Sequence, residues 1–219
     1  MTLCQAILLY SDQSKNKDEL KKLHAWAMSH ASPHYERLVD ERKKELFSGI
    51  RGITLEIGPG TGPNLKYYSG DVQWIGIEPN PHMHPYLRKE AESRGRAADV
   101  RLASAEKLPI EDNFVDFVVS TLVLCSVPDA EAALREALRV LKPGGRFVFL
   151  EHVAAGRGTA LRKLQRTLRT PWRWFVDGCH SDRETGRLIQ GVGFRTVMLD
   201  EFRLPIGIVA PQIAGWAEK

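Results

Sequence analysis

The sequence predicts an α/β protein with a mainly parallel sheet and helices on both of its faces. Short apolar runs alternate with helical patterns from residue 53 to near the end of the chain, as expected for such a sheet. The runs at 53–57 and 114–120 are typical of strands buried on both faces. Three alternating glycines, at 58, 60 and 62, follow the first run directly. Ligands of parallel sheets bind beyond the carboxyl ends of the strands, so we expect the functional site at these glycines.

Composition excludes several classes of protein. The chain has 219 residues and 43% of them are hydrophobic, which suits one large domain with a short appendage. Its apolar run at residues 6–10 is too short for a membrane span and lacks the pattern of a signal peptide. A net charge of +4 is too weak to indicate a nucleic-acid partner. Cys4, Cys125 and Cys179 are odd in number and far apart, which indicates reduced thiols rather than disulfides or a zinc motif. We therefore expect a cytoplasmic protein.

The first 49 residues predict a helical cap that precedes a core domain at residues 50–219. Apolar residues recur with helical spacing at 18–29 and again at 33–47. Pro33 lies between the two segments and suits the first position of a helix. We expect two helices that cover the site as a lid.

The core is expected to contain seven strands, at residues 53–57, 72–77, 100–103, 114–120, 146–150, 194–199 and 213–217. Helices are expected after Pro81, after Asp129, at residues 159–170 and after residues 181–184. Asp129 is a suitable N-cap, and residues 181–184 match a capping box.

The glycine spacing discriminates between ligands. A dinucleotide fingerprint has its third glycine three residues after the second, where this chain has Pro63. The spacing from Glu56 through Gly58, Gly60 and Gly62 suits S-adenosylmethionine, whose methionine end carries an ammonium and a carboxylate but no phosphate. An acidic residue at the strand end and backbone N–H groups serve those two charges.

Glu78 ends the second strand, 20 residues after Gly58. An ionised carboxylate only accepts hydrogen bonds, so Glu78 can hold both hydroxyls of a ribose. It would repel the 2′-phosphate of NADP. Glu78 therefore disfavours NADP, and Pro63 in the glycine turn disfavours a nicotinamide oxidoreductase.

The residues at 56–62, 78–81, 105–109, 116–119 and 141–145 resemble, in order and spacing, the motifs of the class I S-adenosylmethionine-dependent methyltransferases. The resemblance covers about residues 33–219 and implies a Rossmann-like, seven-stranded sheet with an antiparallel last strand. The segments at 121–127, 151–153, 171–172, 177–179, 183–185 and 211–213 are similar to the methyltransferase-like-seven group, the alkyl thiol methyltransferases. Gln212 departs from the histidine expected in that group.

The resemblance implies a set of cofactor-binding residues. Glu56, Gly58 and Gly60 are expected to line the methionine and sugar, and Glu78 to hold the ribose. Ser104 stands where the family often has an aspartate for the adenine amino group. The other expected cofactor residues are Gly62, Pro79, Asn80, Ala105, Glu106, Thr121 and Leu122.

We expect methyl transfer from S-adenosylmethionine to a small-molecule acceptor, with a thiol as the best candidate. A thiol is partly ionised at neutral pH and needs no base, whereas an oxygen acceptor needs one. His152 is the candidate base, although local packing explains it equally well, and Tyr35 is expected beside the acceptor. No metal site is expected.

Two alternatives stay open. The first is methylation of a nitrogen or oxygen on a small metabolite. The second is a non-catalytic cofactor-binding module that docks a partner through the basic segment at residues 157–173. Packed leucines and solvated arginines are favoured for this segment over contact with nucleic acid or a membrane surface. The sequence predicts no oligomeric state.

Overall fold

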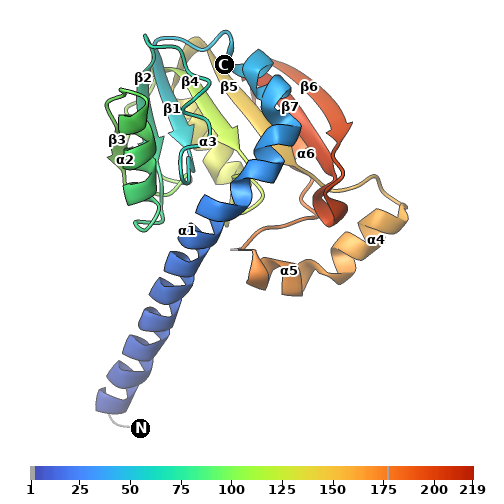
Figure 1. Cartoon of the computed structure of the whole chain (residues 1–219). Helices are drawn as coiled ribbons and strands as arrows, with labels where there is room; N and C mark the ends of the chain where they lie inside the picture. Colours follow the sequence, from blue (N-terminus) through green and yellow to red (C-terminus); the bar gives the residue numbers. More distant parts are fainter. Residues whose placement is uncertain (1–2, 177) are drawn as a thin grey trace.

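The computed structural model describes residues 3–176 and 178–219, without the side chains of residues 3–17, 27–33 and 175. Its strands are β1 Ile53–Ile57, β2 Gln73–Ile77, β3 Asp99–Arg101, β4 Val115–Thr121, β5 Leu141–His152, β6 Thr196–Arg203 and β7 Pro211–Glu218. They form one seven-stranded sheet in the order β3-β2-β1-β4-β5-β7-β6 (Figure 1). The pairs from β3 through β5 are parallel, whereas β7 runs antiparallel to β5 and β6. The predicted sheet and its antiparallel last strand are confirmed.

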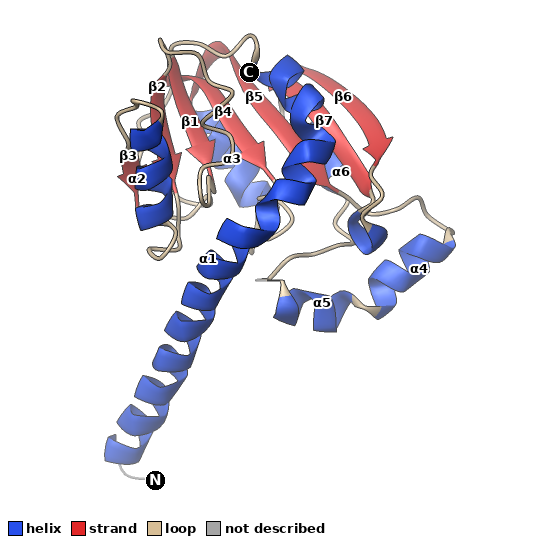
Figure 2. Cartoon of the chain, in the orientation of Figure 1, coloured by secondary structure: helices blue, strands red, loops and turns tan. Residues whose placement is uncertain are grey.

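Helices cover both faces of this sheet. They are α1 Leu3–Phe47, α2 His84–Ser93, α3 Ala130–Val140, α4 Ala160–Thr167, α5 Arg169–Phe175 and α6 Thr185–Gly191, with a short 3-10 helix, η1, at Gly207–Val209. Figure 2 shows α2 and the last turns of α1 in front of the sheet, with α3 and α6 behind it. Leu134 and Ile189 pack with Phe147 on the α3 side, and Phe47 and Leu87 belong to a second core cluster. Burial on both faces explains why β1, β2, β4 and β5 are mainly apolar.

The N-terminal segment forms one helix, so the prediction of two helices was wrong. The helix continues through Pro33. A proline inside a helix removes one hydrogen bond and costs about 3 kcal/mol, which packing elsewhere can offset. Val39 and Phe47 are buried, and Lys43, also buried, binds Glu36 with 2.6 Å between Nζ and Oε1. Among the described residues, no helix is long and apolar enough to cross a membrane.

The segment after β5 also differs from expectation. The helix predicted at 159–170 is divided at Leu168 into α4 and α5. Its leucines do not all pack, because Leu164 and Leu168 are exposed. Gln165 anchors α4 instead: it is buried and accepts a hydrogen bond from the backbone of Ala155 over 2.8 Å.

Arginines of this basic segment have acidic partners. Arg169 binds Asp182 over 2.6 Å, and Arg162 binds Glu184 over 3.1 Å. These carboxylates belong to the predicted capping box, which was wrong: α6 begins only at Thr185 and has no side-chain cap. The Asp129 cap is confirmed, since its side chain accepts a hydrogen bond from the Ala132 N–H over 2.9 Å.

The strand order reverses between β1 and β4, because β2 and β3 follow on one side of β1, and β4 and β5 follow on its other side. This reversal is the switch point, where ligands of parallel sheets bind. The carboxyl ends of β1 and β4 lie at the edge that α1 crosses (Figure 1). A surface hollow of about 550 Å³ lies at the opposite edge, beside Gly52, Asp116 and Gly144. It is therefore remote from the predicted site.

Candidate active site

The turn after β1 is built from glycines in the left-handed region. Gly58, Gly60 and Gly62 have φ of 59°, 57° and 88°. A Cβ on Gly58 would lie 2.7 Å from Val123 Cγ2, and one on Gly62 would lie 2.9 Å from Leu65 Cδ1. A Cβ on Gly60 would have no atom within 4 Å. The first and third glycines are thus required by packing, whereas Gly60 presents bare backbone to open space that a ligand can occupy.

Residues 63–70, all of them described, form turns and no α-helix. A dinucleotide site places the N-terminus of a helix against the pyrophosphate at this point. The turn after β1 therefore lacks the helix N-terminus that binds the pyrophosphate in dinucleotide sites. This agrees with the interpretation of Pro63 in the sequence.

Glu56 is buried beneath this turn and is 1% exposed. Its Oε1 accepts a hydrogen bond from Asn64 Nδ2 over 2.8 Å. Its Oε2 accepts from the Tyr68 hydroxyl and from Trp74 Nε1, each over 2.9 Å. Burial raises the pKa of Glu56, and these three hydrogen bonds oppose the rise. The carboxyl group thereby fixes the segment after the glycines.

Asn64 connects β1 to β4 at the switch point. Its Nδ2 also donates to Thr121 Oγ1 over 3.0 Å. The side chain is 2% exposed, and its Oδ1 has no hydrogen-bond partner among the described residues. Buried carbonyl oxygens normally have a partner, so Oδ1 is available to a donor on a ligand.

Glu78 connects the end of β2 to the glycine turn. Its Oε2 accepts a hydrogen bond from Gly60 N over 3.0 Å, and its Oε1 accepts from Asn80 N over 2.8 Å. A carboxylate only accepts hydrogen bonds and offers about four acceptor positions, which makes it a suitable group for hydroxyl donors. The group lies beside the open face of Gly60.

The remaining expected cofactor residues lie in neighbouring loops at the same edge. Glu78 N donates to Arg101 O over 3.1 Å, which places the loop after β3 beside the loop after β2. In those loops Ala105 is buried, Pro79 and Ser104 are exposed, and Glu106 is half-buried. The structure therefore brings together the strand ends that the sequence identified.

Helix α1 lies against the loop after β2. Asn80 Nδ2 donates to the backbone oxygen of Lys21 over 3.0 Å, and His82 Nε2 lies 2.9 Å from Asp18 Oδ1. Ala25, one turn further along α1, is buried. This part of α1 covers the edge of the sheet next to Glu78.

The loop after β4 is held by Glu151. Leu122 has a φ of 56°, a strained conformation for a residue with a branched side chain. Glu151 Oε1 accepts from the N–H groups of Val123 and Leu124 over 3.0 and 3.1 Å, and from the Ser120 hydroxyl over 2.7 Å. Its Oε2 is buried without a partner among the described residues, and burial raises the pKa of this carboxyl.

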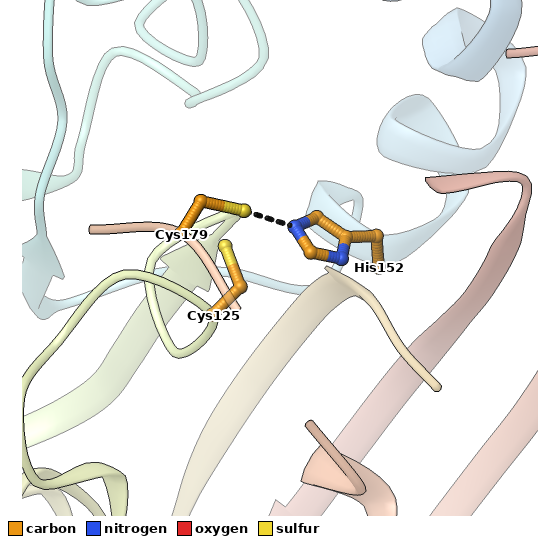
Figure 3. Close-up of side chains that lie close together, drawn as sticks. All are labelled: Cys125, His152 and Cys179. Atoms are coloured by element: carbon orange, nitrogen blue, oxygen red, sulfur yellow. Dashed lines mark hydrogen bonds between the residues drawn. The ribbon is translucent and has the colours of Figure 1, made fainter. Parts of the chain in front are cut away.

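The two expected catalytic residues have different partners. The Tyr35 hydroxyl donates to Gln212 Oε1 over 3.2 Å, and burial raises the pKa of this phenol well above its usual value. His152 pairs with Gln212 across β5 and β7, but its Nε2 lies 3.0 Å from Cys179 Sγ (Figure 3). Tyr35 and His152 therefore flank Gln212 from two different elements.

Comparison with known proteins identifies the family. A methyltransferase domain model matches residues 55–149, which include the glycine turn, Glu78 and the end of β4. The human thiol S-methyltransferase TMT1A is 37% identical over 198 residues, which cover 84% of this chain and 81% of the relative. The chain belongs to the S-adenosylmethionine-dependent methyltransferases. Within them it is similar to the thiol S-methyltransferase group, since human TMT1B is 34% identical over 212 residues, 91% of this chain and 87% of TMT1B.

Solved structures confirm the fold of this methyltransferase. The cyclase SpnF superposes with a TM-score of 0.67 at 21% identity, over 84% of this chain and 80% of SpnF. A putative methyltransferase from Bacillus halodurans gives 0.64 at 15% identity, over 82% of this chain and 98% of that one. Because one of these neighbours is a cyclase, the fold alone does not determine the reaction.

The structure adds two residues near the ends of β1 and β4 that sequence reasoning missed. Asn64 lies outside the glycine motif, and a polar residue in a turn carries no local signal of burial. Glu151 belongs to a segment that resembles the family, but only the structure shows its oxygen beneath the loop at Leu122. Both have a buried oxygen without a partner among the described residues.

The structure also assembles a cluster that the sequence did not predict. Cys125, His152 and Cys179 are all buried, with their nitrogen and sulfur atoms within 4.8 Å of one another. A hydrogen bond from Cys125 and the proximity of His152 lower the pKa of Cys179 to about 4, although burial opposes this. The same hydrogen bond, together with burial, raises the pKa of Cys125. Cys125 and Cys179 are free thiols, as expected, although residues far apart in the sequence meet here.

Proposed function

We propose that this methyltransferase transfers the methyl group of S-adenosylmethionine to a small thiol. The observation that carries the proposal is the junction between Gly60 and Glu78, where open backbone and a carboxylate lie side by side at the switch point. The choice of a thiol is supported by the relatives TMT1A and TMT1B, whose names give thiol S-methylation as their activity.

The residues at the strand ends fit S-adenosylmethionine. The open face of Gly60 leaves room for a ligand against the backbone, and Glu78 would accept hydrogen bonds from the ribose hydroxyls. The partnerless Oδ1 of Asn64 would accept a hydrogen bond from the ammonium group. Glu56 acts indirectly, because both of its oxygens are occupied by Asn64, Tyr68 and Trp74. The other expected residues, Gly58, Gly62, Pro79, Asn80, Ser104, Ala105, Glu106, Thr121 and Leu122, would complete the walls.

The cofactor supplies a methyl group already activated by a sulfonium, so the protein has to align the acceptor and exclude water. Residues 18–25 of α1 would act as a lid, since they contact the loop after β2 through Asn80 and His82. Glu151 would hold Leu122 at the end of β4, beside the transferred group.

We further propose that Tyr35 and His152 line the acceptor side. The raised pKa of Tyr35 keeps its phenol protonated, so its hydroxyl can donate to Gln212 or to an acceptor. A Tyr35→Phe variant is expected to raise the KM for the acceptor and leave the affinity for S-adenosylmethionine unchanged. An unchanged KM would remove Tyr35 from the acceptor site.

A cytoplasmic location is part of the proposal, supported by the two described cysteines, which are both free thiols as in reducing compartments. Ion pairs of Arg162 and Arg169 with Glu184 and Asp182 reduce the charge that a nucleic acid or a membrane would need. The oligomeric state is not part of the proposal.

The proposal is tested in two stages. Calorimetric titration with S-adenosylmethionine and with its demethylated product is expected to show one site for each. A radiolabelled methyl screen over aliphatic thiols, amines and phenols of matched size is then expected to label the thiols. Failure of both titrations would reject the cofactor. Labelling of amines or phenols alone would show that a thiol is not the methyl acceptor. Binding of the cofactor without methyl transfer to any acceptor would indicate a non-catalytic module.

A further inference from the structure

Three side chains with metal-binding atoms converge from separate parts of the chain. Cys125 comes from the loop after β4, His152 is the last residue of β5, and Cys179 lies between α5 and α6. Figure 3 shows the two sulfur atoms and Nε2 of His152 directed toward one common point. The three residues are 2%, 5% and 3% exposed, respectively.

We propose that Cys125, His152 and Cys179 bind one zinc ion. Thiolate and imidazole are the ligands that zinc prefers in proteins. Bonds of about 2.3 Å to sulfur and about 2.0 Å to nitrogen, at tetrahedral angles, place ligand atoms roughly 3.5 to 3.8 Å apart. The three atoms lie within 4.8 Å of one another, and His152 Nε2 and Cys179 Sγ, now 3.0 Å apart, need to separate only slightly.

The surroundings hold the two cysteine ligands in place. Trp172 Nε1 donates to Cys179 Sγ over 3.2 Å, the type of N–H contact that orients a thiolate ligand. The backbone N–H of His180 donates to the Cys125 carbonyl over 2.8 Å and ties the two cysteine segments together. Arg183 donates to the carbonyl of Val127 over 2.8 Å and so fixes the loop that carries Cys125. Neither segment can move without breaking these bonds.

Among the described residues the cluster supplies three ligands, which leaves one tetrahedral position open. Open positions distinguish catalytic zinc sites from structural ones, whose four ligands all come from the protein. Cys125 Sγ lies 3.4 Å from the carbonyl oxygen of Leu122, the residue expected beside the methyl group. The cluster is therefore adjacent to the segment at the end of β4 where the transferred methyl group is expected.

We assign the open position to the sulfur of the acceptor, a step that rests on the proposed thiol methyltransferase function. A bound thiol would lose its proton to solvent as the metal–sulfur bond forms, because a coordinating thiol is deprotonated outright. Its sulfur would then form a bond to the methyl carbon while the donor sulfur keeps the electron pair of the broken bond. The neutral thioether product binds zinc more weakly than a thiolate and would leave.

Cobalt is the probe for the metal site, because tetrahedral cobalt–thiolate centres absorb in the visible and near-ultraviolet regions. The full-length protein is stripped with a chelator, kept reduced with a phosphine and titrated with Co²⁺. We expect saturation at one equivalent and bleaching of the bands by Zn²⁺. Absence of saturable bands would overturn the proposal.

Variants test which residues bind the metal. Cys125→Ser and Cys179→Ser are each expected to weaken binding by more than about 100-fold, since loss of an outer-shell partner alone costs 10- to 100-fold. His180→Gln is the matched control, a neighbouring histidine outside the cluster, and is expected to bind normally. Unfolding temperature and S-adenosylmethionine affinity show whether each variant folds. Normal Co²⁺ binding by both folded serine variants would reject the site.

The assignment of the open position has its own readout. Adding a small aliphatic thiol to the Co²⁺ protein is expected to intensify the sulfur-to-cobalt band, whereas an alcohol of the same chain length leaves it unchanged. An unchanged spectrum with thiol would overturn the assignment. This measurement contains no methyl donor. Loss of methyl transfer with normal cobalt bands would therefore count against the proposed function and not against the metal site.

Discussion

The carboxylate of Glu78 accepts a hydrogen bond from the backbone N–H of Gly60 over 3.0 Å. This bond joins the end of β2 to the turn after β1, and it places a charged acceptor beside backbone that no side chain covers. Substitutions at these two residues test whether the cofactor binds at this turn.

Glu78→Gln is expected to weaken S-adenosylmethionine binding by at least about 10-fold. A hydrogen bond to a charged group contributes roughly 1.5–3 kcal/mol, and an amide cannot accept at both positions. Glu90→Gln, in the exposed ion pair of α2 with Arg94, serves as the control. Calorimetry measures both, and equal affinities of the two variants would exclude Glu78 from the site.

Gly60→Ala is expected to abolish most cofactor binding while the protein still folds. An alanine in the left-handed region costs roughly 1–2 kcal/mol, and its methyl group would occupy the space that we assign to the ligand. Gly144→Ala is a matched control, because Gly144 has a φ of 78° and equally open surroundings at the opposite edge of the sheet. Urea unfolding is expected to show similar losses of stability for the two variants. A normal cofactor affinity of Gly60→Ala would refute this placement.

Glu151→Gln is expected to flatten the dependence of stability on pH. Burial raises the pKa of Glu151 in the folded protein, so this carboxyl keeps a proton that the unfolded chain has already lost. Its contribution to stability is complete below the unfolded pKa and is lost as the pH rises toward the folded pKa, by up to about 1.4 kcal/mol per pH unit. Glutamine does not titrate, and the three hydrogen bonds to its Oε1 can persist.

The variant should therefore gain stability relative to the native protein as the pH rises from 5 to 8. Urea unfolding of both proteins at each pH measures the difference between their free energies of unfolding. A difference in unfolding free energy that does not change with pH would show that Glu151 is ionised in the folded state.

Removal of residues 1–31 is expected to weaken S-adenosylmethionine binding by roughly 3- to 10-fold, because a typical hydrogen bond contributes a net 0.5–1.5 kcal/mol. The truncation deletes the contact of Lys21 with Asn80 and that of Asp18 with His82. Removal of residues 1–17 alone leaves both contacts and is the control. Equal affinities of the two truncated proteins would mean that α1 is not a lid.

Local patterns in the sequence were sufficient to predict the sheet and the glycine turn after β1. Short apolar runs predicted the strands β1, β2, β4 and β5, because burial on both faces leaves few polar positions in these strands. The strands β3 and β6, which have no buried residues, were predicted from the short runs at 100–103 and 194–199. Alternating glycines predicted the turn, since Gly58, Gly60 and Gly62 all need positive φ. The position of Glu78 followed from the strand that precedes it.

The course of the helices was harder to predict. The pattern broke at Pro33, but α1 continues through it, because its later turns are anchored by Val39 and Phe47. The leucines of the basic segment were expected to pack, yet Gln165 and the ion pairs anchor that segment instead. Such contacts involve residues far away in the chain and leave no periodic signal.

By itself, the sequence determined the strands of the sheet and the turn at the end of β1, because each depends on the residues of one short segment. Only the tertiary structure decided that Asn64 joins Glu56 to Thr121 and that Cys125, His152 and Cys179 converge. The members of the cluster are 27 residues apart at each step along the chain, and packing of three separate elements brings them together. Neither hydrophobic periodicity nor the short spacing of metal-binding motifs could predict this cluster, because it depends on how distant segments of the chain pack against the sheet.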